Sequence, residues 1–285
     1  MMAKGIQKWT EAVIERLIKE GQGSGQGPDY VPWVGVHDMA PAGRTHRAWS
    51  PVYRRTIHLQ SDVEWRTFLL LEFSGKFPEL YEGYPLERKI TLEIAAALGV
   101  KHPYYPGTHV PAVMTVDFLG VDKRGGDLRF AAFDSKRSED MDANNADHII
   151  AKLQITRAYF AGMNVPHHLV LHSQLHMQLV KNIEWIRGGI AKTGEDETYA
   201  RCIDEKADQM FYELANGSYT STLAEYCQKF DERHGLRSGD ASRAARMLLW
   251  DHRLKCDLRN SDVAKLPLAS FLIESGYASR RAAGQ

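Results

Sequence analysis

The chain has 285 residues, of which 44% are hydrophobic and 25% are charged. This composition is typical of a globular protein with one large or two ordinary domains, and it excludes a disordered or collagen-like chain. Lysine plus arginine and aspartate plus glutamate each number 36. No global positive field therefore exists to hold a nucleic acid, and any contact with DNA has to be local or assisted by a partner.

The first residues, 1–9, lack the apolar core of a signal peptide, and no run of about 18 apolar residues occurs in the chain. We therefore expect a cytoplasmic protein that does not use a membrane. Cys202, Cys227 and Cys256 contain no Cys-x-x-Cys pair, which argues against a zinc ribbon or a disulfide framework. We expect them to be buried, reduced thiols.

Thr10 is predicted to cap a helix that runs to about Glu20. The Gly-rich segment 21–27 has no Gly-Lys-Ser/Thr end and no apolar strand before it, so we expect a flexible connection without a cofactor role. Residues 43–58 interleave arginines with Trp49 and Tyr53. This segment is either a solvated hairpin or a surface that contacts the DNA backbone. Its arginines are Arg44, Arg47, Arg54 and Arg55.

Ser61-Asp-Val-Glu64 matches a capping box, and the apolar spacing after it predicts a helix to about Phe73. In that interpretation the Glu64 carboxylate bonds back to the Ser61 backbone amide, so periodicity alone does not nominate Glu64 as a metal ligand. Residues 78–86 are expected to be extended, and 91–98 helical.

Two β-prone runs, 112–121 and 128–135, flank a Gly125-Gly126 turn and predict a hairpin. Counting pairs outward from that turn places Asp117 directly opposite Asp134. Because strand side chains alternate, Lys136 shares the face of Asp134.

Two carboxylates and an ammonium thus converge on one patch of this hairpin. A divalent ion such as Mg²⁺ is the simplest way to relieve the repulsion between Asp117 and Asp134. The alternative is a solvent-facing edge hairpin in which Lys136 pairs with one aspartate. The apolar residues on both sides of Asp117 favour a functional site, since a buried, unpaired carboxylate is costly.

Residues 145–160 have helical spacing, and 165–172 are predicted to form a strand, which together with the hairpin gives an α/β fold with a mixed sheet flanked by helices. His168, His172 and His176 follow one another at four-residue spacing. The first two lie in an extended segment and no acidic ligand supports them, so we expect structural histidines rather than a zinc site.

A second region begins near residue 178. Helices are predicted at 197–215, 223–234 and 241–254, and the apolar stretch 266–273 is compatible with a wing strand, which suggests a winged helix-turn-helix. A helical interaction domain that does not bind DNA is the alternative. The basic residues of the last helix fit a recognition helix or a solvated face equally well. They are Arg243, Arg246 and Arg253.

Several motifs occur in an order that closely resembles the TnsA family, the endonuclease subunits of Tns-type heteromeric transposases. They lie at residues 29–33, 43–47, 59–64, 101–103, 113–119, 134–136 and 182–185. The resemblance covers about residues 10–186. It implies a restriction-endonuclease-like domain over 1–177 and a winged-helix, partner-binding domain over 178–285.

The resemblance also implies a role in transposition. Family members cut transposon-end DNA at the 5′ ends, a TnsB-type transposase processes the 3′ ends, and a TnsC-type regulatory ATPase connects them to the target. A non-catalytic, nuclease-like adaptor and a stand-alone restriction or repair endonuclease are the alternatives. The acidic and lysine residues speak against the adaptor, and the zero net charge speaks against the stand-alone enzyme.

Carried over by motif, Glu64, Asp117, Asp134 and Lys136 would be the catalytic residues. The three carboxylates and the carbonyl of Ser135 would hold Mg²⁺, with Mn²⁺ as a substitute, for phosphodiester hydrolysis. This chain has Asp134 where the family usually has Gln, which brings it closer to the general Asp…Asp/Glu-x-Lys nuclease pattern. A further acidic residue of the family falls at a non-acidic position between 153 and 156.

Overall fold

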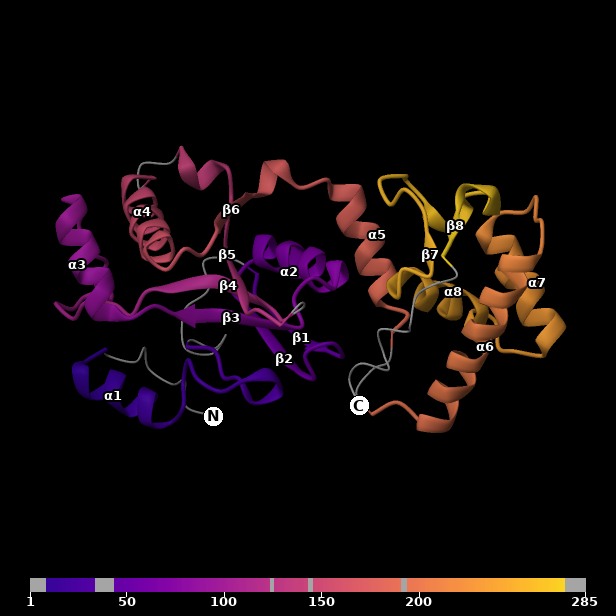
Figure 1. Cartoon of the computed structure of the whole chain (residues 1–285), viewed down its shortest axis with the longest axis horizontal. Coiled ribbons are helices and arrows are strands. Elements are labelled where there is room, and N and C mark those ends of the chain that lie inside the picture. Colours follow the sequence, from indigo (N-terminus) through magenta and orange to yellow (C-terminus); the bar gives the residue numbers. More distant parts are fainter. Residues whose placement is uncertain (1–8, 34–43, 124–125, 143–145, 191–193, 275–285) are drawn as a thin grey trace. The chain divides into compact units, whose positions relative to one another are not determined.

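The computed structural model describes residues 9–33, 44–123, 126–142, 146–190 and 194–274 (Figure 1). The chain divides into two compact units, Met1–Leu175 and His176–Gln285. The division lies two residues before the domain boundary expected from the sequence. Each unit is built around its own core.

A four-stranded sheet forms the centre of the first unit. Its strands are β3 (Glu79–Pro85), β4 (Thr115–Asp122), β5 (Arg129–Lys136) and β6 (His167–Leu171), in that order. Strands β3, β4 and β5 pair antiparallel, whereas β5 and β6 pair parallel. Helices flank this sheet (Figure 1), so the predicted mixed α/β sheet is confirmed.

Helices α3 (Arg88–Leu98) and α4 (Ala146–Gly162) cover one face of the sheet. Side chains from both helices join Leu119 and Ala132 of the sheet in a buried cluster. Among them Ile155 is fully buried, and burial of such a side chain contributes about 1.5–3 kcal/mol. This cluster fixes α4 against the strands that carry the predicted site.

The opposite face carries α2 (Asp62–Ser74) and a hairpin of β1 (His46–Ser50) and β2 (Arg55–Leu59). Their apolar side chains form a second cluster with Phe118 of β4. Phe77 lies against Gly120, where an added Cβ would meet the ring at 2.6 Å. Only glycine allows this close approach between the segment after α2 and the strand.

The register of the central hairpin follows the prediction. The observed partners run from Asp122 and Arg129 to Phe118 and Phe133. One more step in the same register places Asp117 opposite Asp134. Of the predicted turn, Gly126 has a positive φ of 87°, which suits glycine, and Arg124 and Gly125 lie outside the described residues.

Helix α1 (Glu11–Lys19) begins after Thr10, whose hydroxyl accepts the Val13 amide as an N-cap, as predicted. The Gly-rich segment that follows has more structure than a flexible connection. Its backbone exchanges hydrogen bonds with Val31, and a short 3₁₀ helix spans Gly27–Asp29. Four glycines with positive φ make these turns possible. They are Gly21, Gly23, Gly25 and Gly27.

The second unit is mainly helical. Its helices are α5 (Met177–Arg187), α6 (Glu197–Asn216), α7 (Leu223–His234) and α8 (Asp240–Trp250). Helix α8 ends before the predicted residue 254 because His252 takes a left-handed backbone conformation and the chain then enters a strand. That strand, β7 (Leu254–Lys255), pairs antiparallel with β8 (Leu272–Ile273). Further 3₁₀ helices in the described residues of the two units are Glu139–Met141, His172–Gln174, Val263–Lys265 and Leu268–Ser270.

The arginines of the last helix and its end are engaged within this unit. Arg243 donates to the Glu195 carboxylate at 2.7 Å. The guanidinium of Arg246 lies 5.5 Å from the centre of the Trp185 ring, and that of Arg253 lies 4.1 Å from the centre of the Phe211 ring. Because the three arginines contact other side chains of this unit, they are not a purely solvated helix face. They are also not free side chains of the kind that a recognition helix uses to contact bases.

Within the described parts of the chain, no helix combines the length and the apolar character needed to cross a membrane.

Candidate active site

The ammonium group of Lys136 lies at the centre of the predicted site. Its Nζ is 3.2 Å from Oδ2 of Asp117, 3.7 Å from Oδ1 of Asp134, and 3.1 Å from the carbonyl oxygen of Ser135. Burial alone would lower the pKa of Lys136. The attraction of the Asp117 and Asp134 carboxylates is larger than this effect of burial, so the pKa of Lys136 lies above its usual range. The three predicted ligand oxygens, from Asp117, Asp134 and Ser135, thus surround the Lys136 ammonium, which is a cation of the protein itself.

Asp117 is held by the neighbouring strand. Its Oδ2 also accepts the backbone amide of Ser135 at 2.6 Å, and its side chain is 17% exposed. Burial, together with the charge of Asp134, raises the pKa of Asp117 despite the nearby Lys136 ammonium. The carboxylate therefore binds protons more readily than an exposed aspartate.

Asp134 faces Asp117 across the hairpin, as predicted, and is almost fully buried. His167 of β6 lies with Nε2 2.8 Å from Oδ2 of Asp134. Burial opposes ionisation, but Lys136, His167 and the Asp117 backbone together hold the pKa of Asp134 below its usual value. Asp134 is thus the carboxylate of this pair that stays ionised.

His167 is a site residue that the sequence did not suggest. It reaches Asp134 because β6 pairs parallel with β5, with Ala132 beside His167. No local spacing links positions 134 and 167, so only the fold joins them.

Glu64 combines a capping role with a place near the site. Ser61 caps α2 by accepting the Glu64 amide at 3.2 Å. The Glu64 carboxylate accepts the backbone amide of Gln60 at 2.8 Å and the Ser61 hydroxyl at 3.0 Å. The capping bond therefore goes to Gln60, and the expected bond to the Ser61 amide is wrong.

The electrostatic surroundings of Glu64 set it apart from an ordinary cap. Burial and then the charge of Asp117 raise the pKa of Glu64 to about 7. Lys136 acts on the same carboxylate in the opposite direction. Helix α2 therefore brings Glu64 within electrostatic range of both residues.

Ser135 lies on the other side of the strand from Asp134 and Lys136. Its hydroxyl donates to Oγ1 of Thr67 at 3.0 Å, which ties β5 to α2. Its amide binds Asp117 and its carbonyl binds Lys136. The backbone of Ser135, rather than its side chain, faces the site.

The chemistry of these donors fits a hard divalent cation. Asp117, Asp134, Glu64 and the Ser135 carbonyl offer only oxygen, as Mg²⁺ and Mn²⁺ prefer. Among the described residues, however, no three His, Cys, Asp or Glu side chains are gathered as a ready metal site. The ammonium of Lys136 takes the position where the donor oxygens converge.

The predicted DNA-contact arginines differ in their placement. Arg44, Arg47 and Arg54 are exposed, as such a surface needs. Arg55 is 6% exposed, and its guanidinium donates to Glu82 at 2.8 Å and to the Leu80 carbonyl at 2.6 Å. Arg55 therefore belongs to the interior beneath the hairpin, which does not fit the predicted role on the surface.

The three spaced histidines each have a structural contact. His168 stacks on Phe133 with ring centres 5.1 Å apart, and His172 begins a 3₁₀ helix. His176 caps α5 by accepting the Leu179 amide at 3.3 Å. The expectation of structural histidines is therefore consistent with the fold.

The cysteines are free, but only Cys227 is buried. Cys202 and Cys256 are partly exposed, so the prediction of three buried thiols is wrong for these two. Burial raises the pKa of the Cys227 thiol to about 12. It is therefore an inert core side chain.

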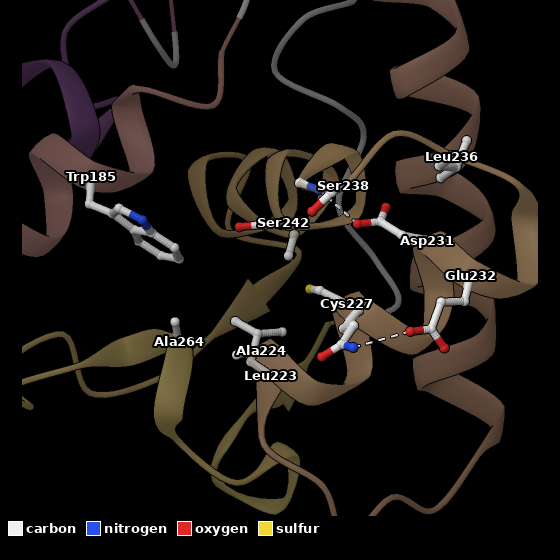
Figure 2. A pocket seen from close by; sticks show the side chains of 13 residues that line it. Trp185, Leu223, Ala224, Cys227, Asp231, Glu232, Leu236, Ser238, Ser242 and Ala264 are labelled. Carbon is white, nitrogen blue, oxygen red and sulfur yellow. Dashed lines mark hydrogen bonds between the residues drawn. The ribbon is translucent and has the colours of Figure 1, made fainter.

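A pocket of about 460 Å³ lies in the second unit between α7, α8 and Trp185 (Figure 2). One carboxylate at this pocket has a structural task, because Asp231 accepts the amides of Gly239 and Ala241 at 2.8 and 2.7 Å and so caps α8. None of the predicted catalytic residues lines this pocket.

Comparison with known proteins gives two matches. Residues 174–258 match the family described as "TnsA endonuclease C terminal". The chain is also 35% identical over 185 residues to the Transposon Tn7 transposition protein TnsA of Escherichia coli. This match covers 65% of the chain and 66% of that relative, just under two thirds of its length. On these two matches, the chain belongs to the TnsA family.

Proposed function

We propose that this protein is a metal-dependent DNA endonuclease of a cut-and-paste transposition complex. It hydrolyses phosphodiester bonds at the 5′ ends of the transposon, while a partner transposase processes the 3′ ends. The observation that carries the proposal is the convergence of Asp117, Asp134 and the Ser135 carbonyl on Lys136, in a member of the TnsA family.

Each residue has a distinct task in this proposal. Asp117, Glu64, Asp134 and the Ser135 carbonyl would hold Mg²⁺, or Mn²⁺ in its place. When bound, the metal supplies an activated water and stabilises charge on the scissile phosphate. His167 keeps Asp134 ionised and oriented through its hydrogen bond.

In this proposal the Lys136 ammonium, which pairs with carboxylates of the protein, would bind the DNA substrate during the reaction. This ammonium now neutralises the carboxylates. In the reaction, the same ammonium would bind a phosphate oxygen or orient the attacking water. The lysine then stabilises the negative charge that develops as the phosphodiester bond breaks.

The proposed partners follow from the family. They are transposon-end DNA, a TnsB-type transposase and a TnsC-type regulatory ATPase. The exposed Arg44, Arg47 and Arg54 would contact the DNA backbone. We also propose a restriction-endonuclease-like fold for the first unit and a winged-helix fold for the second, in which α7, α8 and the β7–β8 pair follow one another.

A nicking assay tests the function. Purified protein is incubated with labelled transposon-end DNA and Mg²⁺, with and without the transposase partner, and compared with Asp117→Ala. We expect partner-dependent cleavage that the substitution abolishes. Cleavage that survives Asp117→Ala would refute the site. Full activity without a partner would favour a stand-alone enzyme, and binding without cleavage would favour an adaptor.

A further inference from the structure

Helix α4 covers the face of the sheet that carries the active-site side chains of β5. Ala132 packs in one buried cluster with Ile155 and Phe160 of α4. Because strand side chains alternate, Asp134 and Lys136 project from the same face as Ala132. Helix α4 therefore borders the candidate active site.

Three exposed basic side chains lie on this helical layer. His148 and Lys152 are one turn apart on α4, about 6 Å along its axis. Lys152 precedes the buried Ile155 by three residues, so it lies on the flank of α4 that turns toward the sheet. Lys101 follows α3, which packs beside α4 (Figure 1).

The neighbouring charges that act on His148 and Lys152 are positive. Burial and the charges of Lys152 and Lys101 lower the pKa of His148. Partial burial of its ammonium and the charge of Lys136 lower the pKa of Lys152. Within the described part of the chain, neither His148 nor Lys152 has a carboxylate partner. Electrostatic contacts therefore link Lys101 to His148, His148 to Lys152, and Lys152 to Lys136.

We propose that Lys101, His148 and Lys152 form a cationic track that binds successive phosphates of one DNA strand and leads that strand to Lys136. The proposal rests on the nuclease function above. A strand carries regularly spaced negative charges, so it matches a row of separate cations better than a single small anion does. The lysines supply the charge, and the His148 ring can donate an N–H to a phosphate oxygen.

Salt-dependent binding of the full chain tests the track. A fluorescent transposon-end duplex is titrated by anisotropy, with Ca²⁺ in place of Mg²⁺ and the partner transposase present, at about 50–200 mM salt. For the double variant Lys101→Gln/Lys152→Gln we expect an affinity about tenfold lower. We also expect a salt slope smaller by about 1.8, or about 0.9 for each lost phosphate contact. Lys152→Arg keeps the charge and should restore the binding lost with Lys152→Gln.

Lys89→Gln is the matched control, because Lys89 is an exposed lysine of α3 that lies outside the track. It should bind as the wild type does, and thermal melts should show that all variants are folded. If the wild type binds and nicks DNA but the double variant keeps the full salt slope, the track is refuted and the function stands. If the wild type neither binds nor nicks, both proposals fail. A variant that loses affinity only for a partner protein would show that the row binds an acidic protein surface, which also refutes the track.

Discussion

Nζ of Lys136 lies 3.2 Å from Oδ2 of Asp117. This contact joins the two strands of the hairpin at the point where their register brings the carboxylates together. The ammonium is therefore both a structural counter-ion and, in the proposed reaction, a catalytic group.

Replacement of this ammonium should separate its two roles. In Lys136→Met the oxygens of Asp117, Asp134 and Ser135 lose a shared cation, so a divalent ion no longer competes with it. We expect tighter binding of Mn²⁺ by calorimetry, together with a loss of nicking of about 100-fold or more. Lys19→Met, on the exposed face of α1, is the control. Weaker Mn²⁺ binding by Lys136→Met would contradict this account.

Metal binding should depend on pH through Glu64. Its pKa is raised to about 7 by burial and by Asp117, so below pH 7 a proton occupies the carboxylate and opposes metal binding. Mn²⁺ affinity should rise by up to about tenfold per pH unit below 7 for this one group, and level off above it. Glu64→Gln should flatten this part of the profile. An affinity that stays constant between pH 6 and 8 in the wild type would be incompatible with this role.

The bond from His167 should matter for stability and for cleavage. His167→Ala leaves a buried carboxylate of Asp134 without a partner at 2.8 Å, which costs about 1–3 kcal/mol of unfolding free energy. Nicking should fall about 10- to 100-fold, as is typical when an orienting partner of a metal ligand is lost. Denaturant unfolding and the nicking assay measure the two effects. The neighbouring His168→Ala removes only a ring contact and should change cleavage little; equal losses in both variants would argue against a specific role for His167.

Arg55 and Arg44 should behave in opposite ways. Arg55→Gln breaks the buried pair with Glu82, so we expect a destabilisation of about 3–5 kcal/mol in urea unfolding. Arg44→Gln lies on the surface and should leave stability unchanged while weakening DNA binding. If Arg55→Gln is as stable as the wild type, the structural assignment of Arg55 is wrong.

Local features of the site were predictable from the sequence. Counting outward from the Gly125-Gly126 pair in the sequence predicts the hairpin register, because each step adds one opposed pair. The observed pairing of Asp122 with Arg129 agrees with that count. The Ser-x-x-Glu pattern predicts the start of α2, since its bonds span only three or four residues. Both therefore depend on short-range geometry alone.

Contacts between distant segments were not predictable in this way. His167 and Asp134 are 33 residues apart, and Arg55 and Glu82 are 27 apart. A polar residue that is buried with a partner has the same local pattern as one in solvent. Whether such a residue is buried with a partner or exposed depends on the tertiary fold. Here it depends on the parallel pairing of β6 with β5 and on the packing of the β1–β2 hairpin against the sheet.

The contact of Phe77 with Gly120 has a consequence for how this sequence can vary. A methyl group at position 120 has no room while the ring is in place, whereas a smaller side chain at 77 would make that room. Gly120→Ala should therefore be harmful alone and milder in combination with Phe77→Ala. Among related sequences we expect the two positions to change together, so that each lineage keeps α2 and β4 at the same separation.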